Sequence, residues 1–393
     1  MAKPLHVRTE AWLRGSHSFA LVYRFQLQAL LKESDLRIHH QEQPPLHPGQ
    51  HDGVDAGFSL GSLEQVEALL VAPSYPPDVI YRLVSPSKLA CSTSERHVCY
   101  LVTELGLGIT RLADDGNDIQ RFEALGGMIH TPSRWSKQRL IHGGFKPEHI
   151  AVIPNGVNPG IYFPMASEDI EAVRAQQGFT PEDIVLLNVG SPVWNKGLDI
   201  LVQCFARLRQ TNRRLHLVLK DQSSVYGVGV QSYVQEILKP FSHDMKEIAL
   251  SGIRVIPAFL TFHAMRSVMN AADFYISPYR AEGFNMPVLE AIACGTRPIV
   301  SAIGSTSDFC HADNAFLIDG TLHGPMKVQD RETDAHFEPN PDALFAILQA
   351  LCQSDPRDRK LPLVEREKSV SQFHWGVAAK ALGALFKDMA ASQ

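Results

Sequence analysis

The sequence predicts an α/β protein of two doubly wound domains, each built on a parallel sheet. Its 393 residues suit two domains of ~100–200 residues each. Strand-like and helix-like segments alternate through both halves, which is typical of parallel sheets with helical crossovers. The run 184–190 is almost entirely apolar, as expected for a strand buried on both faces of such a sheet. Ligands of these sheets bind beyond the carboxyl ends of the strands, so functional residues are sought in the loops that follow strands.

In the first half, the apolar spacing of 19–31 predicts a helix, and Ser133 is predicted to cap a helix over 134–143. Short buried strands are predicted at 79–84, 98–102, 127–132 and 150–153. The turn signal Pro154-Asn155-Gly156 and the prolines after it place a domain linker at about 158–167.

The second half repeats the alternation. Helices are predicted at 198–209 and 263–271, and another ends at Gly295, a residue type that commonly terminates helices. Strands are predicted at 184–190, 215–219, 253–256, 272–278 and 298–300.

Composition excludes several classes of protein. A net charge of −5 gives no sign of a nucleic-acid binder. The six cysteines form neither a Cys-x-x-Cys pair nor a zinc-type cluster, which favours a reducing compartment. The start of the chain lacks the apolar core of a signal peptide, and no apolar run is long enough to cross a bilayer. We therefore expect a cytoplasmic protein.

The most informative stretch is 282–290, where Glu282 and Glu290 lie eight positions apart. The segment before it is predicted to be a strand and the segment after it a helix, so Glu282 lies in a loop and Glu290 in the helix. Backbone N–H groups at the start of that helix can bind an anionic or polar ligand. Either glutamate could instead cap the helix or pair with Arg280 or Arg297.

This stretch resembles the donor-site motif of retaining GT-B glycosyltransferases, glycosyltransferase family 4, also called glycosyl transferases group 1. The resemblance lies in two glutamates separated by seven residues, in Pro287 to Ala291, and in the closing Cys294 to Val300. Asn285 replaces the commoner glycine, a mild departure because Asn tolerates positive φ.

The resemblance implies two Rossmann-like domains that face a central cleft. Residues 1–158 would bind the acceptor, with a closing helix at about 374–393 packed back on them, and 166–373 would bind a nucleotide-sugar donor. Glu290 would accept hydrogen bonds from the ribose hydroxyls. Glu282 would face the sugar as a catalytic residue, with Gly283, Phe284 and Asn285 contributing to donor binding.

The family places an Arg and a Lys against the diphosphate, because charge develops on the departing phosphate. Lys196 matches the lysine and is expected to be catalytic, whereas Ser191, after Gly190, stands where the arginine is expected and carries no charge. Lys220, at the end of the strand 215–219, is the candidate replacement, and a solvated surface lysine is its other interpretation.

Three residues of the first half complete the predicted site. Gly15 and Ser16 correspond to the family's glycine-rich loop against the diphosphate or acceptor, or else form an ordinary helix start with Ser16 or Ser18 as N-cap. Glu104, after the strand 98–102, could orient the acceptor hydroxyl as a catalytic residue, or could be a loop carboxylate in water.

The resemblance implies front-face transfer of a sugar to a glycan, lipid-linked or other hydroxyl acceptor, without a cofactor. No Asp-x-Asp pair occurs, so no metal is expected. The alternative is a nucleotide-sugar- or glycan-binding protein that has lost catalysis. The segment 134–139 is basic and contains Trp135, so it could touch the inner face of a membrane, although a solvated helix face is favoured.

Overall fold

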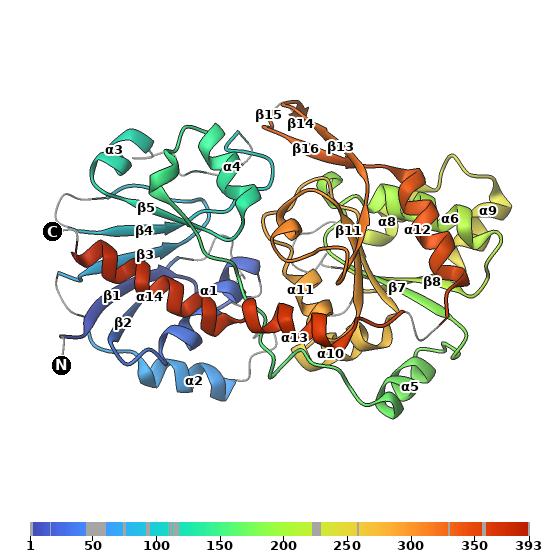
Figure 1. Ribbon diagram of the computed structural model, residues 1–393, viewed down its shortest axis with the longest axis horizontal. Coiled ribbons are helices and arrows are strands. Elements are labelled where there is room, and N and C mark those ends of the chain that lie inside the picture. The colour runs from blue at the N-terminus through green and yellow to red at the C-terminus, as the bar shows by residue number, and fades with distance from the viewer. Residues whose placement is uncertain are drawn as a thin grey trace. The chain divides into compact units, whose positions relative to one another are not determined.

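The computed structural model describes residues 3–15, 17–44, 60–73, 76–91, 95–108, 110, 112, 118–221, 229–257, 259–328, 331–355 and 359–391. The chain forms two compact units (Figure 1). The first comprises Met1–Asn158, Pro325–Ala335 and Phe373–Gln393, and the second comprises Pro159–Gly324 and His336–Gln372.

The first unit is built on a six-stranded parallel sheet of order β2-β1-β3-β4-β5-β6. The chain order reverses between β1 and β3, so the loop after β1 starts at a topological switch point. Its strands are β1 (Leu5–Ala11), β2 (Leu36–Glu42), β3 (Val79–Leu83), β4 (His97–Tyr100), β5 (Met128–Thr131) and β6 (Ile150–Val152). Its helices include α1 (Ser18–Leu30), α2 (Leu60–Leu69), α3 (Ile119–Ala124), α4 (Arg134–His142) and α14 (Trp375–Ala391).

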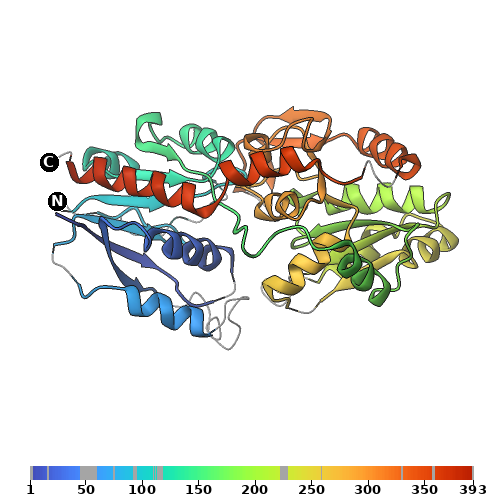
Figure 2. The same ribbon diagram turned by 60° about the horizontal axis from the view of Figure 1, so that its bottom comes forward.

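Helix α14 completes the core of this unit, although its sequence follows that of the second unit. It lies alongside α1 (Figures 1 and 2). The ring of Trp375 stacks on that of Phe25, with centroids 5.3 Å apart. The ring centroid of Phe386 lies 5.4 Å from that of Tyr81 in β3. Phe386 is fully buried. The last helix is therefore part of the hydrophobic core of the first unit.

The second unit is built on a six-stranded parallel sheet of order β12-β11-β10-β7-β8-β9. Its strands are β7 (Ile184–Val189), β8 (Leu215–Lys220), β9 (Ile253–Ile256), β10 (Phe274–Ser277), β11 (Arg297–Ser301) and β12 (Phe316–Ile318). The chain order reverses between β7 and β10, the position at which doubly wound sheets bind ligands. The predicted fold class is confirmed in both units.

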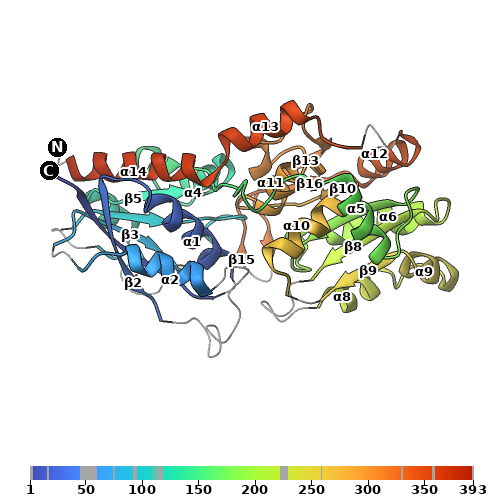
Figure 3. The same cartoon turned by 90° about the horizontal axis from the view of Figure 1, so that it is seen from below.

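The three helices predicted in the second unit are all present. Helix α6 is Leu198–Arg209, α10 is Phe262–Ala271, and α11 is Met286–Ala293. Helices α5 and α10 lie side by side (Figure 3). The remaining helices are α5 (Ser167–Gln176), α8 (Val230–Ile237), α9 (His243–Leu250), α12 (Pro341–Gln353) and α13 (Leu363–Gln372).

A ribbon between β12 and α12 departs from the predicted organisation. Strand β13 (Gly320–His323) pairs antiparallel with β16 (His336–Pro339), and β14 (Lys327–Val328) pairs with β15 (Arg331–Glu332). Residues 325–335 pack with the first unit. The predicted second domain of 166–373 therefore does not hold for this segment, because the chain leaves the second unit after residue 324 and returns to it at residue 336.

Candidate functional site

Two loops at the switch point of the second sheet carry most of the predicted site. One joins β7 to α6 and the other joins β10 to α11. Their backbones are tied together by Asn195, whose carbonyl accepts a hydrogen bond from Arg280 N at 2.7 Å and whose side-chain Nδ2 donates to Ala281 O at 3.0 Å. The two loops therefore form one connected structure.

Gly197 allows the close approach of these loops. It has a φ of +68°, and a Cβ atom there would lie 1.8 Å from the carbonyl oxygen of Pro278. Both the backbone conformation and the space require glycine. The glycine that follows Lys196 thus has a structural reason.

Lys196 and Glu282 meet across the two loops. Lys196 Nζ lies 2.7 Å from Glu282 Oε2, and the side chains are 24% and 10% exposed. The two residues predicted to act on the sugar and the phosphate are therefore neighbours, with the lysine the more accessible.

The sequence alternative in which the glutamates pair with Arg280 or Arg297 is wrong for both arginines. Arg280 is held by Asp199 and Glu338, with N–O distances of 2.6–2.9 Å. It also donates to Trp194 O at 2.8 Å. Arg297 Nη2 donates to Ala312 O. Arg280 thus fixes the loop that carries Lys196.

The second glutamate, Glu290, lies in α11. Burial raises the pKa of its carboxyl group to about 7, and a hydrogen bond with Tyr162 opposes the shift. Tyr162 is itself buried, and burial together with the charge of Glu290 raises its pKa. Sequence reasoning missed Tyr162, because it lies 128 positions earlier in the chain, in the segment assigned to the linker.

The residues between the two glutamates have distinct structural roles. Asn285 has φ +69° and ψ +61°, the left-handed conformation that asparagine tolerates, and its Nδ2 donates to Ser277 Oγ at 3.0 Å. Phe284 is buried against Phe309, with ring centroids 5.2 Å apart. Gly283 is buried beside it. Phe284 can therefore offer a ligand its backbone, because its ring is in the core.

Lys220 lies at the carboxyl end of β8, at the same edge of the sheet. It stands opposite Val189 in the register, and Gly190 N donates to its carbonyl oxygen at 3.4 Å. Lys220 is buried, which lowers the pKa of its ammonium group, and its Nζ donates to the carbonyl oxygen of Asp221. The interpretation of Lys220 as a solvated surface lysine is therefore wrong.

Ser191 stands in the loop next to Gly190. Among the described residues, its buried Oγ has no hydrogen-bond partner. The side chain supplies no charge to the site, as the sequence indicated.

The predicted residues of the first half lie in the first unit. Gly15 follows β1 with a φ of +118°, and the buried Arg24 donates to its carbonyl oxygen. Ser16 lies outside the described residues. The prediction of a serine N-cap is wrong, because His17 caps α1 through its Nδ1, which accepts from Ala20 N.

Glu104 lies in the loop after β4, and its carbonyl oxygen accepts a hydrogen bond from Trp135 Nε1 at 2.8 Å. The neighbouring Thr103 is held by Ser136, whose Oγ accepts from Thr103 N at 2.9 Å. Glu104 therefore lies in a loop whose backbone is fixed by α4.

Most of the basic and aromatic side chains of helix α4 are used internally. Trp135 and Arg139 are buried, and Lys137 donates to the carbonyl oxygens of Pro147 and Ile150. Of the face suggested for lipid contact, Arg134 is exposed, whereas Trp135 is not. Within the described ranges, no helix combines the length and hydropathy that a bilayer crossing needs.

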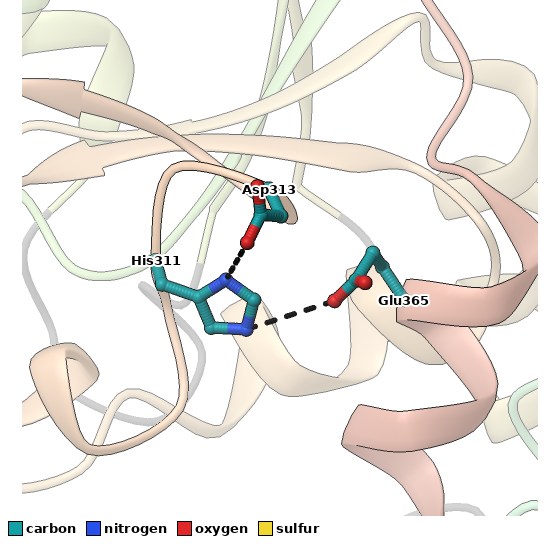
Figure 4. Close-up of side chains that lie close together, drawn as sticks. All are labelled: His311, Asp313 and Glu365. Carbon is teal, nitrogen blue, oxygen red and sulfur yellow. Dashed lines mark ion pairs between the residues drawn. The ribbon is translucent and has the colours of Figure 1, made fainter.

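One cluster of metal-ligating side chains lies elsewhere in the second unit. His311 Nδ1 is 3.4 Å from Asp313, and Nε2 on the other edge of the ring is 3.8 Å from Glu365 (Figure 4). The two ring nitrogens face different carboxylates. The ring thus bridges the loop after β11 to α13.

Two six-stranded parallel sheets of this order make up the GT-B class of fold. Residues 169–324 match the model of the family Glycosyl transferases group 1.

Similar solved structures cover almost the entire chain. Sucrose-phosphate synthase from Thermosynechococcus elongatus has a TM-score of 0.67 and 15% identity, covering 99% of this chain and 100% of its own. Anabaena HepE in complex with UDP and glucose has a TM-score of 0.65 and 16% identity, covering 98% and 100%. At these identities the similarity establishes the fold.

Curated relatives match a shorter part. Mannosylfructose-phosphate synthase from Agrobacterium fabrum is 29% identical over 41% of this chain and 34% of its own. A D-inositol 3-phosphate glycosyltransferase from Corynebacterium aurimucosum is 25% identical over 66% of this chain and 56% of its own. The chain thus spans about a third to just over half of the length of these two relatives.

Proposed function

We propose that this protein is a retaining glycosyltransferase that moves a sugar from a nucleotide diphosphate sugar to a hydroxyl acceptor. The observation that carries the proposal is the 2.7 Å contact between Lys196 and Glu282, on two loops at the switch point of the second sheet. This contact supports the proposal, because a cation that could stabilise the departing phosphate lies beside a carboxylate that could bind the sugar.

The chemistry needs few groups. The bond between the anomeric carbon and the phosphate oxygen breaks, and the acceptor oxygen bonds to the same face of that carbon. The acceptor's proton passes to the departing phosphate, so no protein base is required. The residues of the second unit would bind and orient the donor: Lys196 at the phosphate, Glu282 at the sugar and Glu290 at the ribose hydroxyls.

Lys220 is proposed to supply the second cation that Ser191 lacks. Support comes from its place at the same strand edge and from its contact with Gly190. In Lys220→Met we expect the Kd for UDP-glucose to rise about tenfold or more, because a charge-assisted hydrogen bond contributes about 1.5–3 kcal/mol. An unchanged Kd by calorimetry would rule out this role.

Metal-independent transfer is part of the proposal. Turnover should persist in excess EDTA and should not rise on addition of Mg²⁺ or Mn²⁺, because the lysines would balance the phosphate charge. Loss of turnover in EDTA with recovery on adding a divalent cation would contradict it.

The similar proteins suggest which donor and which acceptors to test first. Since HepE has been solved with UDP-glucose, that nucleotide sugar is the first donor to test. The names of the curated relatives specify inositol phosphate or sugar phosphate chemistry, so D-inositol 3-phosphate and D-fructose 6-phosphate are reasonable first acceptors.

The deciding experiment measures nucleotide release from UDP-, GDP- and ADP-sugars without acceptor. Wild type is compared with Glu282→Ala and with Glu171→Ala, which removes an exposed carboxylate on α5. We expect release from one donor, lost in Glu282→Ala and retained in Glu171→Ala.

A binding protein that has lost catalysis is the second candidate, favoured by the uncharged Ser191. It predicts calorimetric binding of a nucleotide sugar with no release, with or without the acceptor probes. Absence of any binding would overturn both proposals.

A further inference from the structure

The ribbon segment 325–335 is not explained by the donor site. It follows directly after residue 324, where the family match ends, and it packs with the first unit rather than with the sheet that precedes it. Its contacts therefore lie in the unit expected to bind the acceptor.

The segment is bound to the loop that carries Glu104. Asp334 N donates to Leu105 O at 2.8 Å. Gly106 has a φ of +97°, and a Cβ there would lie 2.8 Å from Asp334 Cβ. A Cβ at Gly108 would lie 2.2 Å from the carbonyl oxygen of Glu332. Two glycines thus allow the ribbon to approach the backbone of this loop closely.

The carboxylate of Asp334 contacts two side chains of helix α4. It lies 2.9 Å from Arg139 Nε and 2.9 Å from His142 Nδ1, both on α4. Burial lowers the pKa of Arg139, and the negative charge of Asp334 opposes that shift. Asp334 therefore supplies the counter-charge of a buried guanidinium group.

Arg139 extends this connection back to the loop. Its guanidinium lies 4.6 Å from the centre of the Trp135 ring, and Trp135 Nε1 donates to Glu104 O. Asp334 thus holds the Glu104 loop twice, through its own backbone and through Arg139 and Trp135.

We propose that residues 325–328 and 331–335 form one wall of the acceptor-binding surface of the first unit, and that Asp334 is the residue that positions the Glu104 loop there. The proposal rests on the proposed function, because it takes the loop after β4 as part of the acceptor site. It adds that acceptor selection depends on a segment encoded within the C-terminal half of the chain.

The test compares Asp334→Asn with Glu332→Gln in the full-length protein. Glu332 lies on the same ribbon and loses the same charge, but it meets the loop through its backbone oxygen, which the substitution retains. The acceptor probes are D-inositol 3-phosphate and D-fructose 6-phosphate, and UDP-glucose is the donor.

For Asp334→Asn we expect the KM for the acceptor to rise about tenfold or more, with a smaller change in the KM for UDP-glucose. Hydrogen exchange of the amides at 103–108, without any substrate, should become faster. Glu332→Gln should match wild type in both measurements.

The outcomes separate this proposal from the proposed function. Faster exchange with an acceptor KM no higher than in Glu332→Gln would overturn the acceptor role, and so would an equal rise in both KM values. Unchanged exchange at 103–108 would overturn the positioning role, even if the wild-type protein turned over neither probe. Failure of the proposed function alone would appear as no nucleotide release and no transfer by the wild-type protein, with exchange still faster in Asp334→Asn.

Discussion

Glu290 combines a proposed ligand contact with a pKa near neutrality. Its pKa is raised to about 7 by burial. A carboxylate accepts hydrogen bonds from a diol more strongly than the neutral acid does. We therefore expect the Kd for UDP-glucose, which has no phosphate titrating in this range, to fall as the pH rises from about 6 to about 8. Calorimetry across this range should show a flat, weaker profile for Glu290→Gln, and an equally steep one would contradict the assignment.

The same group has the opposite effect on folding without ligand. The folded protein holds this proton more tightly than the unfolded chain does, because the pKa is raised from 4.5 to about 7. The contribution of Glu290 to stability is thus full below the unfolded pKa of 4.5 and declines as the pH rises from there to about 7.

Arg280 is a second residue whose role can be measured, because it holds two carboxylates and the Trp194 carbonyl oxygen at once. Lysine retains the charge but cannot form the paired hydrogen bonds. We expect Arg280→Lys to lower the free energy of unfolding by about 2 kcal/mol in urea titrations. The exposed Arg214→Lys is the control and should change it by less than about 0.5 kcal/mol. Equal effects would show that the bidentate geometry contributes little.

At the scale of elements, the packing of the β7–α6 loop against the β10–α11 loop depends on Gly197. An added Cβ at 1.8 Å from Pro278 O cannot fit without moving one loop. We expect Gly197→Ala to destabilise the protein by about 2–4 kcal/mol, from the left-handed backbone and the overpacking together. Gly324→Ala, where a Cβ meets nothing within 4 Å, is the control for thermal unfolding. A Tm equal to that of the control would contradict this role of Gly197 in the packing of the two loops.

The elements that could be predicted from the sequence were those with a strong apolar pattern. Helix α6 and strand β9 have the predicted bounds. Strands β1 and β2 were missed. Strand β1 carries Arg8 and Glu10, which form an ion pair with each other, and Glu10 also pairs with Arg82 in β3. These charged residues interrupt the apolar pattern by which a buried strand is predicted.

The candidate site was predictable only in part, because only some of its residues lie in local motifs. Lys196 and Glu282 each lie in a local motif that can be read from a few neighbouring residues. Tyr162 and Asp334 have no such motif, because their partners are far away in the chain. Pairings of that kind arise from the tertiary structure and leave no local signal in a single sequence.

At the scale of the whole molecule, the first unit depends on residues 373–391. Trp375 and Phe386 are buried against Phe25 and Tyr81. A chain ending at Gln372 should therefore lose the folded first unit and keep the second, because each fully buried large apolar side chain contributes about 1.5–3 kcal/mol. Hydrogen exchange should show fast amides throughout β1–β6 and protected amides in β7–β12. Restored protection on adding a peptide of residues 373–391 would support the same assignment, and a protected first unit in the shortened chain would contradict it.

The position of α14 in the sequence also affects how the protein is made. Domains usually fold in the order in which the ribosome synthesises them. Here the first unit takes up 1–158 early, but two further segments of it are translated after the sheet of the second unit. The second unit can therefore be complete while the first still exposes the apolar surface that α14 will cover. The half of the molecule that is translated first is thus the last to finish folding, and it is the part that needs protection from aggregation on the ribosome.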